Sequence, residues 1–239
     1  MKVINDLIGY KNLRIIQNSE WFSFSLDSVL LPRFVTINKD TKNILDIGTG
    51  NAPIPLILST RTKCNIFGIE IQKDIYDLAQ ESIKINHLQD QIQLINDDVH
   101  NIGQYFKYGF FDVIVSNPPY FKLQEKSKIN EDIHKTIARH ELKIDLEEII
   151  EISSMYLKNG GLLAIVHRSD RLIELISLFK KYKIEPKKIQ LIYPKLGEES
   201  NIVLIEGKKG GNPGMKIMPS IIVHNHDGTY SEEVLKYFS

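Results

Sequence analysis

The feature that most constrains the fold of this chain is an alternation of two apolar patterns that begins near residue 43. Short runs rich in Ile and Val are apolar at nearly every position, which is typical of β-strands covered on both faces. Between these runs lie longer stretches whose apolar residues recur at helical spacing. The predicted strands are residues 43–47, 65–71, 92–95, 111–115, 161–166, 189–193 and 202–205, and the clearest predicted helices are residues 74–87, 145–157 and 170–182.

Strands that alternate with helices predict a doubly wound α/β fold, because each crossover helix returns the chain to start a parallel neighbour. We therefore predict a mostly parallel, seven-stranded, Rossmann-like sheet. The last two predicted strands differ, since residues 194–200 between them are too few for a crossover helix. This pair is predicted to be antiparallel and to lie near the C-terminus.

The length of 239 residues suits one large domain, and we expect residues 1–239 to form a single unit. Within it we expect a core at residues 41–209, an N-terminal extension at 1–40 and a C-terminal tail at 210–239 that packs on the core. The extension is predicted to contain a strand at 11–17 and a short helix at 27–36. The tail is predicted to contain a turn at 227–228 and a helix from about residue 231.

Composition bounds the compartment and the kind of partner. Cys64 is the only cysteine, so no internal disulfide can form, which suits a reducing compartment. No run of about eighteen apolar residues predicts a membrane span, and the N-terminus lacks a signal-peptide pattern. The formal net charge of zero argues against a purely electrostatic nucleic-acid binder. We predict a cytoplasmic protein that does not associate with a membrane.

A glycine-containing loop follows the first core strand, in the stretch LDIGTGN of residues 45–51. Gly48 and Gly50 allow a tight turn and let a ligand approach the backbone at the end of the strand. The dinucleotide fingerprint requires a third glycine, but Pro53 occupies that place. The loop therefore predicts a ligand site without an evident pyrophosphate cradle.

Acidic residues stand at the ends of the first three core strands. Asp46 lies in the first strand, Glu70 comes twenty residues after Gly50 at the end of the second, and Asp97 and Asp98 follow the third. Glu70 has the spacing of an acid that accepts hydrogen bonds from ribose hydroxyls. Three acidic ends would repel a pyrophosphate, so S-adenosylmethionine, which has a ribose, an adenine and a cationic centre, fits better. Taken singly, the aspartates could equally cap helices or turns.

The fourth core strand ends in the stretch FDVIVSNPPY of residues 111–120. Residues before a proline are held extended, and neither Pro118 nor Pro119 has a backbone N–H to donate. The Asn117 side-chain oxygen and the Pro118 carbonyl can then accept both hydrogens of one planar NH2 group, while Tyr120 offers a face for base stacking. We predict Asn117, Pro118, Pro119 and Tyr120 as a catalytic clamp for N-methylation. The alternative is a turn that simply ends the strand.

Together these residues resemble the class I S-adenosylmethionine-dependent methyltransferases that modify exocyclic or amide nitrogens. The nearest likeness is to the bacterial tRNA1(Val) (adenine-37-N6)-methyltransferase family, whose NPPY motif resembles residues 117–120. Residues 51–55 (NAPIP) depart from the pattern, because relatives often have another small residue there. Otherwise the likeness covers nearly the whole chain, with further similar segments at 22–31, 138–141, 193–197, 203–211 and 227–230.

This resemblance implies a function and a set of site residues. It implies methyl transfer from S-adenosylmethionine to N6 of an adenine in tRNA, at adenine 37 in the anticodon loop of a valine tRNA, where bases are unpaired. It also implies that residues 1–40 close over the cofactor, that Asp98 contacts the cofactor's adenine amine, and that the clamp holds the target adenine. We expect no metal and no obligate protein partner. The predicted cofactor-binding residues are Asp46, Gly48, Gly50, Glu70, Ile71, Asp97, Asp98, Val99 and Asn117.

Basic residues are candidates for contacts with the RNA backbone. Residues 179–217 carry nine lysines against four glutamates, and such a surplus could hold phosphates if it lay near the site. Solvated surface is the simpler interpretation of scattered lysines. The candidates are Lys122, Arg139, Lys180, Lys181, Lys187 and Lys188.

Three other functions remain open on the sequence. A protein glutamine-N5 methyltransferase acting on a release factor would use the same clamp, because a glutamine amide also presents a planar NH2. Such enzymes carry a separate N-terminal helical domain, for which residues 1–40 are too few. A DNA adenine-N6 methyltransferase usually needs an added recognition region. A non-catalytic S-adenosylmethionine-binding module would have no need of the clamp.

Overall fold

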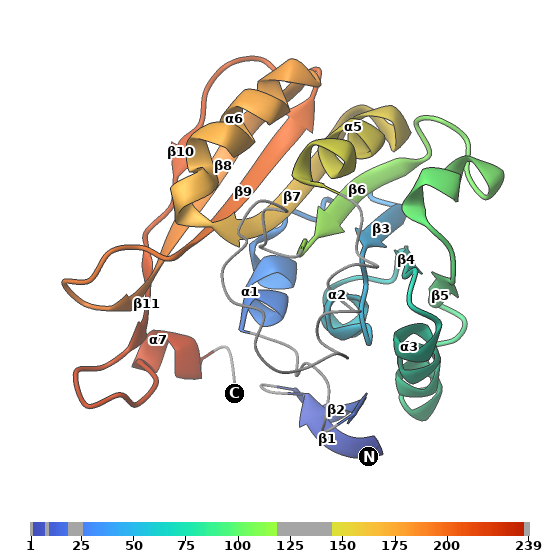
Figure 1. Cartoon of the computed structure of the whole chain (residues 1–239), viewed down its shortest axis with the longest axis horizontal. Helices are drawn as coiled ribbons and strands as arrows, with labels where there is room; N and C mark the ends of the chain where they lie inside the picture. Colours follow the sequence, from blue (N-terminus) through green and yellow to red (C-terminus); the bar gives the residue numbers. More distant parts are fainter. Residues whose placement is uncertain (1, 8–9, 19–25, 119–144, 237–239) are drawn as a thin grey trace, which may run out of the picture.

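A nine-stranded β-sheet organises the part of the chain that the computed structural model describes, namely residues 2–7, 10–18, 26–118 and 145–236 (Figure 1). Its strands are β3 (Asn43–Ile47), β4 (Asn65–Ile69), β5 (Ile92–Ile95), β6 (Phe111–Ser116), β7 (Leu157–Arg168), β8 (Ile184–Lys195), β9 (Ile202–Lys209), β10 (Lys216–Ile217) and β11 (Ile221–His224). They lie in the order β10–β8–β9–β7–β6–β3–β4–β5, and β11 also pairs with β8.

The strand directions confirm most of the predicted topology. The strands from β5 across to β7 are parallel to their neighbours, whereas β9 is antiparallel to both β7 and β8. The doubly wound, mostly parallel sheet and the antiparallel pair near the C-terminus are therefore confirmed. The predicted number of seven strands is wrong, because β10 and β11 add two short strands parallel to β8. They have two and four residues, which is too short for an apolar run to be detected.

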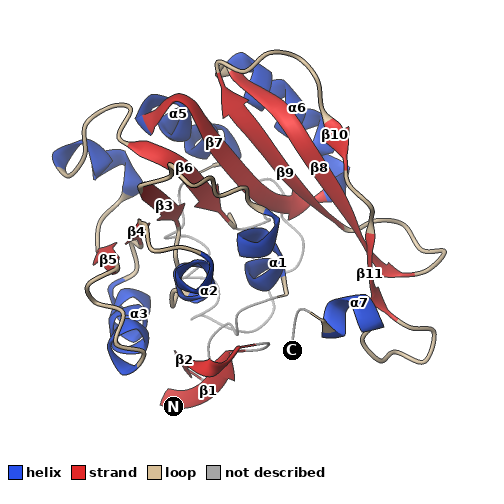
Figure 2. Cartoon of the chain, turned by 180° about the vertical axis from the view of Figure 1, so that it is seen from behind, coloured by secondary structure: helices blue, strands red, loops and turns tan. Residues whose placement is uncertain are grey.

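Helices cover both faces of the sheet (Figure 2). Successive residues of the strands belong to two separate cores, so that Ile44 and Val113 face one core while Leu45 and Ile114 face the other. This arrangement explains the continuous apolar runs in the sequence. None of the helices in the described ranges is long and apolar enough to cross a membrane. The first core contains residues of α1 (Asp27–Phe34), α2 (Pro53–Arg61), α3 (Lys73–Ile85) and α7 (Glu232–Leu235), and the second contains residues of η1 (Val99–Gln104), α5 (Leu146–Tyr156) and α6 (Leu172–Lys181).

Two helices show what local sequence can and cannot predict. The predicted helix at 145–157 is confirmed as α5, which begins with a capping box in which the Asp145 and Glu148 side chains each accept from the other's backbone N–H. In contrast, α2 was not predicted, because Pro53 and Pro55 fall in its first turn. Proline is tolerated there, since the first N–H groups of a helix have no partner within the helix.

The N-terminal segment forms a hairpin, made of β1 (Lys2–Leu7) and β2 (Tyr10–Asn18), that packs on α3. The Asn86 side chain accepts from the Arg14 N–H at 2.9 Å and donates to its carbonyl at 2.6 Å. The Ser82 hydroxyl accepts from the Ile16 N–H at 2.9 Å. The strand predicted at 11–17 is confirmed as part of β2, whereas β1 was not predicted.

An ion pair connects the segment before β3 to strands β8 and β9. Glu206 on β9 is only 4% exposed, and its carboxylate accepts from the backbone N–H of Thr36 at 2.6 Å and from its hydroxyl at 2.9 Å. The Lys188 ammonium on β8 lies 3.3 Å from the same carboxylate and donates to the Phe34 carbonyl at 2.7 Å. Lys188, one of the predicted RNA contacts, thus makes internal contacts.

Glu206→Ala is expected to lower the free energy of unfolding by about 3 kcal/mol, because it leaves the Lys188 charge and the Thr36 donors without their buried acceptor. Urea denaturation followed by circular dichroism measures this loss. The matched control is Glu198→Ala, which removes an exposed glutamate in the β8–β9 loop and should stay within about 0.5 kcal/mol of the wild type. Equal stabilities for the two variants would contradict the role of Glu206.

Candidate active site

The carboxyl ends of β3, β4, β5 and β6 lie side by side at one edge of the sheet. Ile47 pairs with both Ile69 and Ser116, and Ile69 pairs with Ile95. Because these strands are parallel, the segments that follow them meet at this edge, which is where open α/β sheets bind ligands. These segments are residues 48–50, 70–71, 96–99 and 117.

The glycine loop after β3 is held against the end of β4. The N–H groups of Gly48 and Thr49 both donate to the Ile69 carbonyl, at 3.0 and 3.1 Å. Gly48 and Gly50 have φ values of +71° and +58°, which favour glycine. The Thr49 side chain packs so closely on Gly68 that a Cβ atom at Gly68 would lie 2.9 Å from the Thr49 hydroxyl oxygen. The end of β4 therefore holds the loop in place, and Gly48 remains exposed to solvent.

Glu70 is buried and supports this loop. One of its carboxylate oxygens accepts from the Gly50 N–H and the other from the Gln72 N–H, each at 3.0 Å. Only 4% of Glu70 is exposed, and burial raises its pKa, opposed by the hydrogen bonds from Gln72 and Gly50. The Asn96 side chain donates to the Glu70 carbonyl at 2.8 Å and so fixes its backbone from β5. Asn96 was not predicted as a site residue.

Asp46 is completely buried below the loop. One of its oxygens accepts from the Thr49 hydroxyl at 2.7 Å, and no hydrogen-bond donor within the described residues reaches the other oxygen, Oδ1. Burial raises the pKa of Asp46 to about 8, and the nearby Glu70 contributes in the same direction. A buried carboxyl oxygen without a donor suits a ligand group that carries a positive charge or an N–H.

Asp97 and Asp98 organise the turn after β5. Asp97 accepts hydrogen bonds from the Asn101 amide and the Tyr105 hydroxyl, both at 2.8 Å, and these bonds lower its pKa. Asp98 caps η1 by accepting from the His100 N–H at 2.9 Å, and its hydrogen bond to the imidazole raises the pKa of His100. The capping role that the sequence left open is therefore present at Asp98, and both aspartates follow β5 at the same edge of the sheet as Glu70.

The predicted clamp begins where β6 ends. The Ser116 hydroxyl donates to the Ile47 carbonyl at 2.9 Å and joins the ends of β6 and β3. Asn117 is half-buried and its side-chain NH2 donates to the Ser28 hydroxyl at 3.2 Å, while Pro118 is buried. Ser28, which contacts the predicted clamp, was not among the predicted site residues. The remaining predicted residues of this region lie outside the described residues: Pro119, Tyr120, Lys122 and Arg139.

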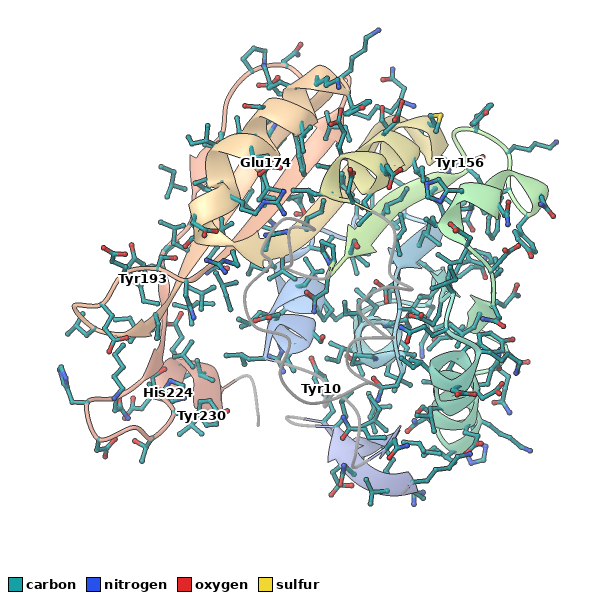
Figure 3. All side chains as sticks on the ribbon, in the orientation of Figure 1. Tyr10, Tyr156, Glu174, Tyr193, His224 and Tyr230 are labelled. Carbon is teal, nitrogen blue, oxygen red and sulfur yellow. The ribbon has the colours of Figure 1, made fainter. Side chains whose placement is uncertain are left out.

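The end of β7 lies next to the end of β6 and contains a buried histidine. Ser116 pairs with Ile165, so the residues after Ser116 run alongside those that lead to His167. His167 is fully buried and its Nδ1 accepts from the Arg168 N–H at 2.8 Å. Burial lowers its pKa to about 4, so the imidazole is neutral at pH 7. Arg171 follows and forms an ion pair with Glu174, which Figure 3 labels on α6.

The predicted RNA-contact lysines of the C-terminal half are not at this edge. Lys180 and Lys181 end α6, and Lys187 lies early in β8, whose first residue Ile184 pairs with Lys209 at the end of β9. In Figure 1 these ends lie on the opposite side of the sheet from the end of β6. Lys180 pairs with Glu185 at 2.5 Å, Lys181 with Glu147, and Lys187 donates to the Asn212 carbonyl at 3.0 Å.

In the sheet, the antiparallel strand β9 lies between β7 and β8. This strand order, together with the acidic residues at the carboxyl edge, defines a class I methyltransferase fold. Within the described residues, no group of three or more His, Cys, Asp or Glu side chains could hold a metal ion. A family model described as a methyltransferase domain matches residues 38–209. The chain belongs to this methyltransferase family.

Comparisons with individual proteins agree with the family. The tRNA1(Val) (adenine(37)-N6)-methyltransferase of Porphyromonas gingivalis is 28% identical over 239 residues, which cover 97% of this chain and 92% of the relative. A predicted O-methyltransferase from Agrobacterium tumefaciens has a similar structure, with a TM-score of 0.69, 19% identity and coverage of 88% and 94% of the two chains. The structure of a geranyl diphosphate C-methyltransferase from Streptomyces coelicolor, solved with S-adenosyl-L-homocysteine, is also similar. Its TM-score is 0.58 at 12% identity, and the match covers 77% of each chain. The resemblance inferred from the sequence is confirmed.

Proposed function

We propose that this methyltransferase transfers the methyl group of S-adenosylmethionine to N6 of an adenine in tRNA, namely adenine 37 in the anticodon loop of a valine tRNA. The observation that carries the proposal is the position of Asn117. It directly follows β6, at the edge that also holds the glycine loop and Glu70. The proposed clamp for an amine and the ribose-spaced acid therefore lie at the same edge of the sheet.

We assign the cofactor to Asp46, the glycine loop and Glu70, because their chemistry fits its parts. A Cβ atom built on Gly48 would meet no protein atom within 4 Å, so a ligand can approach the backbone there. Glu70 is at the spacing of an acid that accepts from ribose hydroxyls. The unpartnered Oδ1 of Asp46 suits the cationic amino acid portion. Asp97, Asp98 and the adjoining Ile71 and Val99 complete the assigned site.

The clamp residues supply orientation. Bound S-adenosylmethionine contributes an activated methyl group on a sulfonium centre, so no strong base is needed. The Asn117 side-chain oxygen and the Pro118 carbonyl accept the two hydrogens of the target amine. These bonds draw electron density onto its nitrogen and direct the lone pair toward the methyl group. Tyr120 would stack on the base and hold its plane.

Asp46 makes cofactor binding dependent on pH. Because its pKa is raised to about 8, Asp46 carries a proton in most free molecules at pH 7, and a bound cation at Oδ1 should lower that pKa. We expect binding at pH 7 to release close to one proton and binding well above pH 8 to release none. Calorimetry in buffers of different ionisation enthalpy counts the protons. Asp46→Asn should abolish the release, and a binding enthalpy that is the same in all buffers would contradict the assignment.

The same group gives the free protein a pH-dependent stability. A carboxyl whose folded pKa lies above its unfolded value of about 4 ionises first in the unfolded chain. The contribution of Asp46 to stability therefore declines as the pH rises from about 4 to 8 and is constant above that. Asp46→Asn should flatten this part of the profile.

The choice of tRNA rests on relatives rather than on geometry. Curated relatives over most of the chain are named for adenine 37 of tRNA1(Val). Bases of an anticodon loop are unpaired and can be turned outward at low cost, which suits a clamp that must enclose the whole amine.

The decisive experiment is methyl transfer from labelled S-adenosylmethionine to tRNA that lacks the modification, followed by nucleoside mass spectrometry. N6-methyladenosine should form in valine tRNA and disappear when adenine 37 is replaced by guanine. Label at another position or in another tRNA would correct the target. Label in a glutamine-bearing release factor or in DNA, with none in tRNA, would replace the proposal by one of those activities.

A further inference from the structure

We infer that Ser28 is a positioning residue that orients the side-chain amide of Asn117 so that its oxygen faces the substrate. The inference rests on the proposed clamp and extends it to α1, a segment that precedes the first core strand. No periodic pattern or motif in the sequence links the two residues, which are 89 positions apart.

The contact that carries the inference joins α1 to the end of β6. The Asn117 Nδ2 atom donates to the Ser28 Oγ atom at 3.2 Å. Ser28 is only 6% exposed and lies in the first turn of α1, beside the buried Asp27 and Val29. The packed helix therefore holds the hydroxyl in place. Little solvent reaches it to compete for the amide.

Orientation matters because the two ends of an asparagine amide have opposite chemistry. The oxygen accepts hydrogen bonds and the NH2 group only donates them. A substrate amine presents hydrogens, so a clamp built on Asn117 works only if the oxygen faces it. When Nδ2 is committed to Ser28, Oδ1 lies on the other branch of the amide plane, away from the hydroxyl. A rotated amide would oppose the substrate NH2 with another donor.

A matched set of serine variants tests this role. Ser28→Ala removes the acceptor, and Ser28→Thr keeps the hydroxyl. Ser59→Ala removes a hydroxyl that is equally buried but bonds to the Leu56 carbonyl within α2. We expect Ser28→Ala to lower kcat for tRNA about 10-fold and to leave the Kd for S-adenosylmethionine and the Tm nearly unchanged. The threonine variant should recover most of the rate, and Ser59→Ala should have wild-type kcat.

A second background distinguishes orientation from packing. In Asn117→Asp the two carboxylate oxygens are equivalent acceptors, so either one can face the amine. Ser28→Ala should therefore lower kcat much less in the Asn117→Asp protein than in the wild type. Equal losses in both backgrounds, a kcat for Ser28→Ala within twofold of wild type, or a loss matched by a fall in Tm and cofactor affinity would each overturn the inference.

Nuclear magnetic resonance tests the contact without any substrate. The Asn117 side-chain amide protons, assigned by their absence in Asn117→Asp, should exchange with solvent several-fold faster in Ser28→Ala than in the wild type. If the wild type methylates no tRNA while this exchange differs as expected, the proposed function fails and the Ser28 contact stands. Identical exchange rates would overturn the contact even if tRNA is methylated.

Discussion

Replacing Asn117 with alanine is expected to lower the rate of methyl transfer at least ~100-fold, while the affinity for S-adenosylmethionine stays within a few-fold. The variant removes one of the two acceptors that hold the target amine, and the Pro118 carbonyl alone cannot fix the plane of an NH2 group. The effect belongs to kcat, because the clamp's bonds strengthen as the nitrogen becomes tetrahedral and positively charged. The glycine loop and Glu70, which we assign to the cofactor, are held by contacts that do not include Asn117.

The measurement is single-turnover methyl transfer with saturating tRNA, together with calorimetric titration of the cofactor. The matched control is Asn65→Ala, which removes an exposed asparagine at the start of β4, on the opposite edge of the sheet. The control should turn over at the wild-type rate. If Asn117→Ala also retained that rate, the strand end would be an ordinary turn and the proposed clamp would have to be abandoned.

The position of Asn117 relative to Glu70 was predictable because of how parallel sheets are built. Each apolar run marks a buried strand, and parallel strands bring their carboxyl ends to one edge whatever the sequence between them. The same logic located Gly48 and the two aspartates after β5. It needed no knowledge of side-chain contacts, which is why these strand ends meet at one edge as predicted although the predicted number of strands is wrong.

Contacts between segments that are distant in sequence could not be predicted in this way. The bond from Asn117 to Ser28 depends on how α1 packs across the sheet, and one helix carries no signal of its neighbour's position. The lysines of α6 and β8 illustrate the same limit for charge. A local surplus of lysines indicates a basic segment, but the direction of β8 determines at which edge of the sheet these lysines lie. Lys188 is instead held by an ion pair with Glu206. Proline composition also misled, because Pro53 and Pro55 open α2.

Glu70→Ala is expected to weaken the binding of S-adenosylmethionine by about 1–3 kcal/mol, a factor of roughly 5 to 160 in Kd. Two losses add up in this variant. The ribose hydroxyls would lose the acceptor that we assign to them, and the backbone N–H groups of Gly50 and Gln72 lose the carboxylate that holds them at 3.0 Å. The glycine loop should therefore become less ordered in the free protein, which adds an entropic cost to binding.

Glu70→Gln retains part of the backbone support, and calorimetric titration of the cofactor measures both variants. A glutamine oxygen can still accept from one backbone N–H, but its NH2 group would oppose the other, so we expect an intermediate affinity. The matched control is Glu81→Ala on α3, whose exposed side chain pairs with Lys2 away from this edge. It should bind the cofactor as the wild type does. Wild-type affinity in Glu70→Ala would contradict both assigned roles of Glu70, because the loss of either the ribose contact or the order of the loop would weaken binding.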